Sequence, residues 1–315
     1  MSTKHLFILN PAAGKYDTVP EVTKAIEKAF KDPLLLREQY EIYVTASPGD
    51  ATIATEKAAA ENDEVRVYAC GGDGTLNEVV CGAAQKENVA VCPVPVGSGN
   101  DFIKYFEDLP KEAFLDLIAC VRGEADKCDL LRVDGHWCLN IASVGLDAIT
   151  AARQQKVKKW PLVSGPFAYK IALFYSFLSS MKNAIELEID GEKVAVGNGR
   201  ITIAAAGNGR WYGGGFKATP TANVRDGFID FIAIPTMSRL QFLKYVGDYK
   251  KGDHMETMKD HLFYRRCKKV RFLAPKPVVV QVDGEILHLK DPEIEIFPGA
   301  LNLILPRFKR ARPQE

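Results

Sequence analysis

The most informative segment in the first part of the chain is Cys70-Gly71-Gly72-Asp73-Gly74-Thr75-Leu76-Asn77-Glu78. It follows an apolar run, Val65–Cys70, and begins a helical pattern over Thr75–Gln85. Three glycines let the backbone approach a ligand closely, and amides at a helix N-terminus favour an anion. Asp73 either acts on a ligand through Mg²⁺ or caps the turn. Taken alone, the segment fits a plain strand-to-helix turn about as well as an anion-binding loop.

Two further loops favour the anion-binding interpretation. Asn10-Pro11-Ala12-Ala13-Gly14-Lys15 follows the apolar run Lys4–Leu9, and Pro95-Val96-Gly97-Ser98-Gly99-Asn100-Asp101 ends the run Val89–Pro95. Ligands of parallel sheets bind at the carboxyl ends of the strands. The three loops therefore predict one site for a polyanion such as a nucleotide, with Ser98 and Asn100 as hydrogen-bond donors. No Walker loop, no G-x-G-x-x-G and no protein-kinase signature occurs.

Strands and helices alternate through residues 1–128, which predicts an α/β domain with a mostly parallel sheet and helices on both faces. Residues 129–299 are rich in strands and in Asp-Gly turns, which predicts a sandwich or barrel. Residues 300–315 either belong to that second domain or return to the first. The predicted segments of the first domain are Lys4–Leu9, Glu21–Phe30, Tyr40–Thr45, Ala51–Ala60, Val65–Cys70, Thr75–Gln85 and Val89–Pro95. Those of the second are the strands Asp129–Val133, Trp137–Val144, Ile185–Asp190, Arg200–Ala206, Phe228–Ile234, Val270–Leu273 and Val278–Val282, and the helices Pro166–Met181 and Arg239–Lys250.

Composition excludes several classes of protein. The 315 residues carry 41 basic and 40 acidic side chains, so the chain as a whole is not a strongly basic nucleic-acid binder. Seven cysteines without a C-x-x-C pair predict reduced, buried thiols and a cytoplasmic location. The most apolar stretch, Trp160–Met181, contains Lys170 and two prolines, which argues against a membrane-spanning helix.

In order and spacing, the three loops resemble the diacylglycerol kinase catalytic-domain family, in particular the soluble bacterial lipid kinases related to diacylglycerol and sphingosine kinases. The resemblance implies an α/β N-terminal domain like that of NAD kinase and diacylglycerol kinase, a β-rich sandwich-like C-terminal domain, and an ATP site. The family's nucleotide-binding positions correspond here to Asn10, Pro11, Ala12, Ala13, Gly14, Thr45, Gly71, Gly72, Asp73, Gly74, Thr75, Leu76, Asn77 and Ser98. Many members have threonine in place of Ser98, which keeps the hydroxyl.

The resemblance also assigns chemistry to the second domain. Asn223-Val224-Arg225-Asp226-Gly227-Phe228 is similar to a segment that holds Mg²⁺, which implies Asp226 as a ligand with backbone oxygens of Asn223 and Phe228. Many members have two acidic residues there, whereas this chain has Arg225. Val282-Asp283-Gly284-Glu285 is similar to a motif whose proton acceptor corresponds to Glu285. Both segments also fit ordinary Asp-Gly turns. Asp129 matches a family aspartate without an assigned role.

The predicted function is an ATP- and Mg²⁺-dependent lipid kinase that phosphorylates a diacylglycerol-like alcohol and yields phosphatidic acid, with Glu285 and Asp73 as catalytic residues. The alternatives are an NAD kinase-like phosphotransferase, a kinase for a sphingoid base or phosphatidylglycerol, and a catalytically silent lipid-binding protein. The expected partner is a lipid at a membrane surface and not a nucleic acid, and homodimers are common among such relatives. The basic stretches 153–159, which Trp160-Pro161-Leu162 follows, and 307–312 either contact the membrane or are solvated charge.

Overall fold

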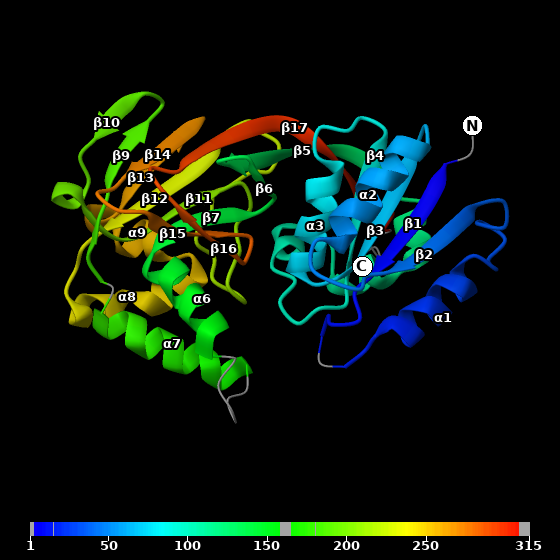
Figure 1. Ribbon diagram of the computed structural model, residues 1–315, viewed down its shortest axis with the longest axis horizontal. Coiled ribbons are helices and arrows are strands. Elements are labelled where there is room, and N and C mark those ends of the chain that lie inside the picture. The colour runs from blue at the N-terminus through cyan, green and yellow to red at the C-terminus, as the bar shows by residue number, and fades with distance from the viewer. Residues whose placement is uncertain (1–2, 15, 158–164, 180, 309–315) are drawn as a thin grey trace, which may run out of the picture. The chain divides into compact units, whose positions relative to one another are not determined.

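The computed structural model describes residues 3–14, 16–157, 165–179 and 181–308. Contacts divide the chain into two compact units (Figure 1). The first unit comprises Met1–Cys128 and Gly299–Glu315, and the second comprises Asp129–Pro298. The chain therefore enters the second unit once and returns to the first at Gly299.

The first unit is built on a parallel sheet with the strand order β17–β4–β3–β1–β2. Its strands are β1 (Lys4–Leu9), β2 (Gln39–Val44), β3 (Val65–Gly71), β4 (Val89–Pro95) and the last part of β17 (Glu293–Leu305). Leu9 lies opposite both Val44 and Cys70, and Gly71 lies opposite Pro95. This register brings the carboxyl ends of β1 to β4 to the same edge of the sheet.

Helices cover the sheet of the first unit. They are α1 (Val19–Ala29), α2 (Asp50–Glu61), α3 (Asp73–Ala83), α4 (Lys111–Leu115) and α5 (Leu117–Val121), with a 3₁₀ turn η1 (Phe102–Tyr105). One face of the sheet packs on α1, which buries Val22 and Ile26 at helical spacing, and on α5. Helix α3 packs against β3, β4 and α2. Nearly every residue of β1, β3 and β4 is buried, as expected for parallel strands covered on both faces.

The second unit is a sandwich of two sheets. One has the order β10–β9–β14–β17 with β5 and β6 alongside, and the other has the order β13–β12–β11–β7–β15–β16 with β8 beside β11. Phe272 of the first sheet and Phe231 of the second meet in the core, with ring centroids 6.0 Å apart. The strands are β5 (Glu124–Val133), β6 (His136–Cys138), β7 (Ile141–Gly145), β8 (Asn183–Ala184), β9 (Glu186–Ile189), β10 (Glu192–Val194), β11 (Arg200–Gly207), β12 (Ile229–Pro235), β13 (Phe263–Cys267), β14 (Lys269–Leu273), β15 (Val278–Val282) and β16 (Glu285–Leu289).

A helical layer covers the outer face of the second sheet. Alternate residues of β11, Ile203 and Ala205, point away from the sandwich core into a second apolar cluster with Leu146 and Tyr249 from the helices. The layer contains α6 (Leu146–Val157), α7 (Gly165–Ser179), α8 (Arg239–Lys251), α9 (His254–Thr257) and the 3₁₀ turn η3 (Lys259–His261), and a further 3₁₀ turn, η2 (Gly197–Gly199), precedes β11. Within the described ranges, no helix has the length and apolarity needed to span a bilayer.

Most predicted elements are present, and β1 and β4 have the predicted bounds. The single strand predicted over Trp137–Val144 is wrong, because it is two strands, β6 and β7. The chain breaks there because the amides of Leu139, Asn140 and Ile141 donate to the Asp283 carboxylate instead of to a strand. The sequence leaves open the domain of Ala300–Leu305; in the structure this segment lies in β17, where Asn302 and Leu303 pair with β4. The seven cysteines are free thiols, and all but Cys81 are buried.

Candidate active site

The three loops predicted to form one site meet at the carboxyl edge of the first unit's sheet. The amides of Val96 and Gly97 both donate to the carbonyl oxygen of Gly71, each at 3.0 Å. The Asn10 side chain donates from Nδ2 to Thr75 Oγ1 at 2.9 Å, and its Oδ1 accepts from the Ala12 amide. Hydrogen bonds thus join the loop after β3 to the loops after β1 and β4.

Glycines make this close approach possible. A Cβ on Gly97 would lie 2.3 Å from Gly72 Cα, and a Cβ on Gly71 would lie 2.2 Å from Thr75 Oγ1. Gly14 has φ +90°, and a Cβ there would lie 3.0 Å from the Val96 carbonyl oxygen. A side chain at Gly97 would push the loops after β3 and β4 apart, and a side chain at Gly71 would displace Thr75.

The N-terminus of α3 is open toward solvent. Its N-cap residue is Gly72, and no side chain caps the helix. A Cβ on Gly74 would meet nothing within 4 Å, so there is free space beside the first turn. Unpaired amides and the helix dipole favour an anion at such a position, so the residues present fit a phosphate group of ATP.

Asp73, the first residue of α3, holds the neighbouring loop. Its Oδ1 accepts from the amides of Asp101 at 2.6 Å and Phe102 at 3.3 Å. Burial, followed by the neighbouring charge of Asp101, raises the pKa of Asp73. Asp101 is itself paired with Lys104 Nζ at 2.5 Å. In this arrangement the Asp73 carboxylate positions residues 99–102 beside α3.

The remaining predicted nucleotide-binding residues differ in exposure. Ser98 is exposed on the loop after β4, whereas the amide of Thr45 donates to the Leu9 carbonyl oxygen directly after β2. Leu76 and Asn77 are buried within α3, and Asn77 Oδ1 has no hydrogen-bond partner among the described residues. Asn100 is turned inward, with Nδ2 donating to Gly97 O at 2.6 Å. The edge therefore presents the Ser98 hydroxyl and the open end of α3 to a ligand.

A small cavity lies under these loops. Gly71, Asp73 and Asn100 contribute to its lining, and its volume is about 10 Å³. That is room for about one water molecule. A nucleotide would therefore lie on the exposed side of the loops and not inside this cavity.

In the second unit, the hairpin between β15 and β16 contains the predicted proton acceptor. Val282 pairs with Glu285, and the turn residues Asp283 and Gly284 have φ +46° and +94°. This is a two-residue turn of the kind that Asp-Gly favours. Glu285 is exposed at the start of β16, and its carboxylate makes no hydrogen bond or ion pair within the described part of the chain.

Asp283 anchors this turn. Its carboxylate accepts from the amides of Leu139 at 2.6 Å, Asn140 at 3.1 Å and Ile141 at 3.0 Å. Burial raises the pKa of Asp283 to about 6, although the hydrogen bonds oppose the shift. The carboxylate fixes the hairpin to the loop before β7 and thereby fixes the position of Glu285.

Two buried asparagines near this anchor were not predicted as site residues. Asn208 Nδ2 donates to the carbonyl oxygens of Asp129 and Leu139, each at 2.7 Å, and Asn140 Nδ2 donates to Trp211 O. The Oδ1 atoms of Asn140 and Asn208 have no partner among the described residues. The sequence Gly207-Asn208-Gly209-Arg210 is a usable signal for them, since it places a polar turn at the end of an apolar strand.

The carboxylate oxygens of Asp226, the predicted Mg²⁺ ligand, already contact other groups of the protein. Its Oδ1 accepts from the Phe228 amide at 3.1 Å, and its Oδ2 lies 2.5 Å from the guanidinium of Arg266. Arg225 and Lys268 add positive charge nearby, and Asn223 Oδ1 accepts from the Arg225 amide. Mg²⁺ requires free oxygen ligands. As arranged, these residues do not fit a magnesium ion.

Elsewhere too, the described residues contain no group of three or more His, Cys, Asp or Glu side chains that could hold a metal. Asp129, which had no predicted role, supports the segment that contains Asp226. Its Oδ2 accepts from the Gly227 amide at 2.7 Å, and its own amide donates to Val224 O. Asp129 therefore positions residues 224–227 of the second unit.

Parts of the two predicted membrane-contacting stretches lie outside the described residues, namely 158–162 and 309–312. In the described parts, Arg153 donates to Ser176 Oγ at 3.1 Å and the Arg307 amide donates to Ala119 O. Arg153 is thus engaged between α6 and α7.

Comparisons with known proteins agree with this arrangement. The family model described as diacylglycerol kinase catalytic domain matches residues 4–133, and the one described as YegS C-terminal NAD kinase beta sandwich-like domain matches residues 140–305. The chain is 29% identical to diacylglycerol kinase of Staphylococcus aureus (strain bovine RF122 / ET3-1) over 289 residues, 90% of this chain and 87% of the relative. It is also 29% identical to diacylglycerol kinase of Staphylococcus carnosus (strain TM300), over 90% of this chain and 89% of the relative. A crystal structure of a diacylglycerol kinase from Bacillus anthracis str. Sterne, 21% identical, superimposes with a TM-score of 0.67 over 96% of both chains, which shows the same fold.

Proposed function

The chain belongs to the diacylglycerol kinase catalytic-domain family and is a lipid kinase, and from this premise we propose that it transfers the γ-phosphate of ATP to the hydroxyl of a diacylglycerol-like lipid, giving phosphatidic acid. The main support for ATP as the phosphate donor is the uncapped N-terminus of α3. Three loops meet there, beside open space at Gly74. Such a helix end favours phosphate.

The first unit supplies the phosphate-binding groups in this proposal. The amides of Gly72 to Thr75 and the hydroxyl of Ser98 would hold the phosphates of ATP, and Asp73 keeps the loop of Ser98 in place. Bound to the phosphates of ATP, Mg²⁺ would neutralise part of their charge. Phosphoryl transfer depends chiefly on positioning and on such charge stabilisation.

The second unit supplies the proton acceptor. The lipid hydroxyl oxygen bonds to the γ-phosphorus while the bond to the bridging oxygen of ADP breaks, and the hydroxyl proton passes to the Glu285 carboxylate. Glu285 suits this role because its carboxylate is exposed and unpaired among the described residues, on a turn that Asp283 fixes.

The test is the transfer of labelled γ-phosphate from ATP, with Mg²⁺, to lipids in mixed micelles. The panel contains diacylglycerol, a sphingoid base and phosphatidylglycerol, with NAD as a separate acceptor. Label in phosphatidic acid is the expected result. Label in another lipid would keep the mechanism and change the substrate, and label only in NAD would favour an NAD kinase-like enzyme. No transfer at all would favour a silent lipid-binding protein.

The role of Glu285 is tested by Glu285→Gln, which keeps the shape of the side chain and removes the proton-accepting charge. Turnover should be lost while ATP binding stays near that of the parent. Glu186→Gln, another exposed glutamate at the first position of a strand, is the matched control and should remain fully active. Parent-level turnover in Glu285→Gln would remove Glu285 from this role.

A further inference from the structure

Helices α7 and α8 of the second unit pack against each other at the outside of the helical layer. The rings of Phe177 and Phe242 lie 5.9 Å apart, centroid to centroid. Arg239, the first residue of α8, donates to the carbonyl oxygens of Phe177 and Leu178 in the last turns of α7. These contacts fix the two helices as one surface (Figure 1).

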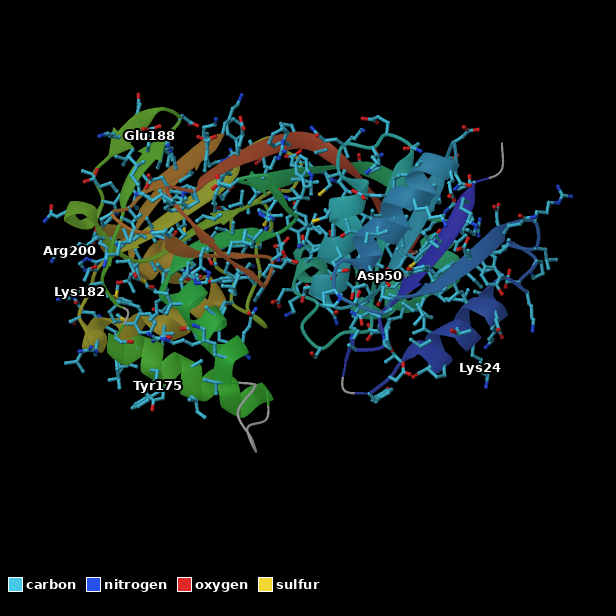
Figure 2. All side chains as sticks on the ribbon, viewed as in Figure 1. Lys24, Asp50, Tyr175, Lys182, Glu188 and Arg200 are labelled. Carbon is cyan, nitrogen blue, oxygen red and sulfur yellow. The ribbon has the colours of Figure 1, made fainter. Side chains whose placement is uncertain are left out.

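The outer side of this helix pair carries five large apolar side chains in contact with solvent. They are Phe174, Tyr175, Leu178, Leu240 and Leu243, which we call the α7–α8 face, and they are 46% to 81% exposed. In Figure 2, Tyr175 projects from α7 away from the body of the second unit. An exposed cluster of apolar side chains is typical of a surface that binds a protein or a membrane.

These side chains are not needed to hold α7 in place. The opposite side of α7 is buried through Ala172 and Ser176, and Ser176 accepts a hydrogen bond from Arg153 of α6. Tyr249 of α8 is likewise buried in the apolar cluster beneath the helices. The α7–α8 face is therefore additional to the surface that stabilises the fold.

Positive charge accompanies this face. Helix α8 contains four basic residues (Arg239, Lys244, Lys250 and Lys251) and one acidic residue (Asp248). Lys182, just beyond α7, is also exposed (Figure 2). Among the described residues, Lys182, Lys244 and Lys251 form no ion pair, so their charges are available to a partner.

We propose that the α7–α8 face docks the protein on an anionic lipid bilayer, with the apolar side chains entering the interface and the lysines contacting lipid headgroups. Helices that lie in the plane of a membrane combine these two features. The choice of a membrane over a protein partner rests on the proposed function, since the lipid substrate resides there. Positive charge beside an apolar surface matches an anionic bilayer.

The experiment measures cosedimentation of the whole chain with vesicles of phosphatidylglycerol and phosphatidylcholine, without ATP. The test variant is the triple change Leu178→Gln, Leu240→Gln and Leu243→Gln. The matched control is Leu34→Gln, Leu36→Gln and Ile53→Gln, which removes three equally exposed apolar side chains from the first unit. We expect the test variant to bind vesicles at least about tenfold more weakly and the control to bind like the parent.

A second variant, Lys244→Glu with Lys251→Glu, tests the electrostatic part. Its binding to anionic vesicles should fall sharply, and added salt should weaken the binding of the parent. Parent-level binding by both the leucine and the lysine variants would overturn the proposal. Equal losses in the test and control triples would overturn it as well, because binding would then not be specific to this face.

Two further readouts distinguish membrane docking from catalysis and from self-association. In detergent micelles the leucine variant should keep the parent's kinase activity, whereas on vesicles containing the lipid substrate its activity should fall. A parent that is inactive on every lipid yet binds vesicles through this face would reject the proposed acceptor and support the docking surface. A parent dimer that becomes monomeric in the leucine variant would instead assign the face to a second copy of the chain and overturn the proposal.

Discussion

The guanidinium of Arg266 lies 2.5 Å from the Asp226 carboxylate, and it also covers the ring of Phe228 at 4.6 Å from the ring centroid. Asp226 is the residue that the family resemblance assigns to Mg²⁺. Here an arginine from β13 supplies the positive charge that a metal ion would bring to residues 223–228. The contact joins two segments 40 residues apart in the chain.

We therefore expect the stability of this segment to depend on Arg266 and not on a divalent ion. Arg266→Gln should lower the free energy of unfolding by about 1 kcal/mol, since the pair is partly exposed and its value is reduced by solvent. Denaturant unfolding of the parent with Mg²⁺ and with EDTA should give the same midpoint. A clear increase in the parent's midpoint with Mg²⁺ that is lost in Asp226→Asn would show that Asp226 does bind the ion.

Asp283 should titrate well above the ordinary range of an aspartate. Its pKa is about 6, raised by burial from an ordinary value of 3.8, so folding favours the protonated carboxyl. The stability that this group contributes is full below pH 3.8 and is lost as the pH rises through 6, by an amount on the order of 1–3 kcal/mol. A ¹³C NMR titration of the carboxyl signals, with Asp283→Asn to identify the resonance, measures this directly. A carboxyl that titrates near 4 would contradict the expected burial of the hairpin anchor.

Substitutions at two glycines of the sheet edge test folding and ligand binding separately. Gly97→Ala brings a Cβ to 2.3 Å from Gly72 Cα, so it should lower the free energy of unfolding by about 1–3 kcal/mol. Gly74→Ala meets nothing within 4 Å and lies in a helix, so it should leave stability unchanged or raise it by up to about 1 kcal/mol.

The same pair tests the phosphate site. The added methyl group in Gly74→Ala occupies the space beside the α3 amides, so its ATP affinity, measured by calorimetry, should fall by about tenfold, a loss of about 1.4 kcal/mol in binding. Normal ATP affinity in Gly74→Ala would place the phosphates elsewhere than at the N-terminus of α3.

The sequence predicts those parts of the structure that are determined by residues close to one another in the chain. Strands β1 and β4 are short apolar runs followed by polar, glycine-containing loops, and their shared sheet edge follows from the parallel topology. The break between β6 and β7 could not be predicted, because its cause, Asp283, lies 144 residues after Leu139. The contact between Asp226 and Arg266 could not be predicted either, for the same reason. An Asp-Gly pair indicates a turn, but it does not indicate which amides or cations its carboxylate will meet.

The buried polar group beneath the helical layer supports a last prediction. Tyr212 donates from its hydroxyl to Asp147 Oδ2 at 2.7 Å and lies 3.0 Å from the hydroxyl of Tyr249. Burial raises the pKa of Asp147, so ionisation of this carboxyl opposes folding as the pH rises. Tyr212→Phe removes a donor from a buried carboxylate and should lower the free energy of unfolding by about 1–3 kcal/mol, more at pH 8 than at pH 3.

Asp147→Asn is the companion variant for this group. It keeps an acceptor for Tyr212 and cannot ionise, so its stability relative to the parent should improve from pH 3 to pH 8. In the Asp147→Asn background, Tyr212→Phe should lower the free energy of unfolding at pH 8 by less than it does in the parent. A double-mutant cycle by denaturant unfolding measures this coupling. Additive effects at both pH values would mean that the Tyr212 hydroxyl does not stabilise the Asp147 carboxylate.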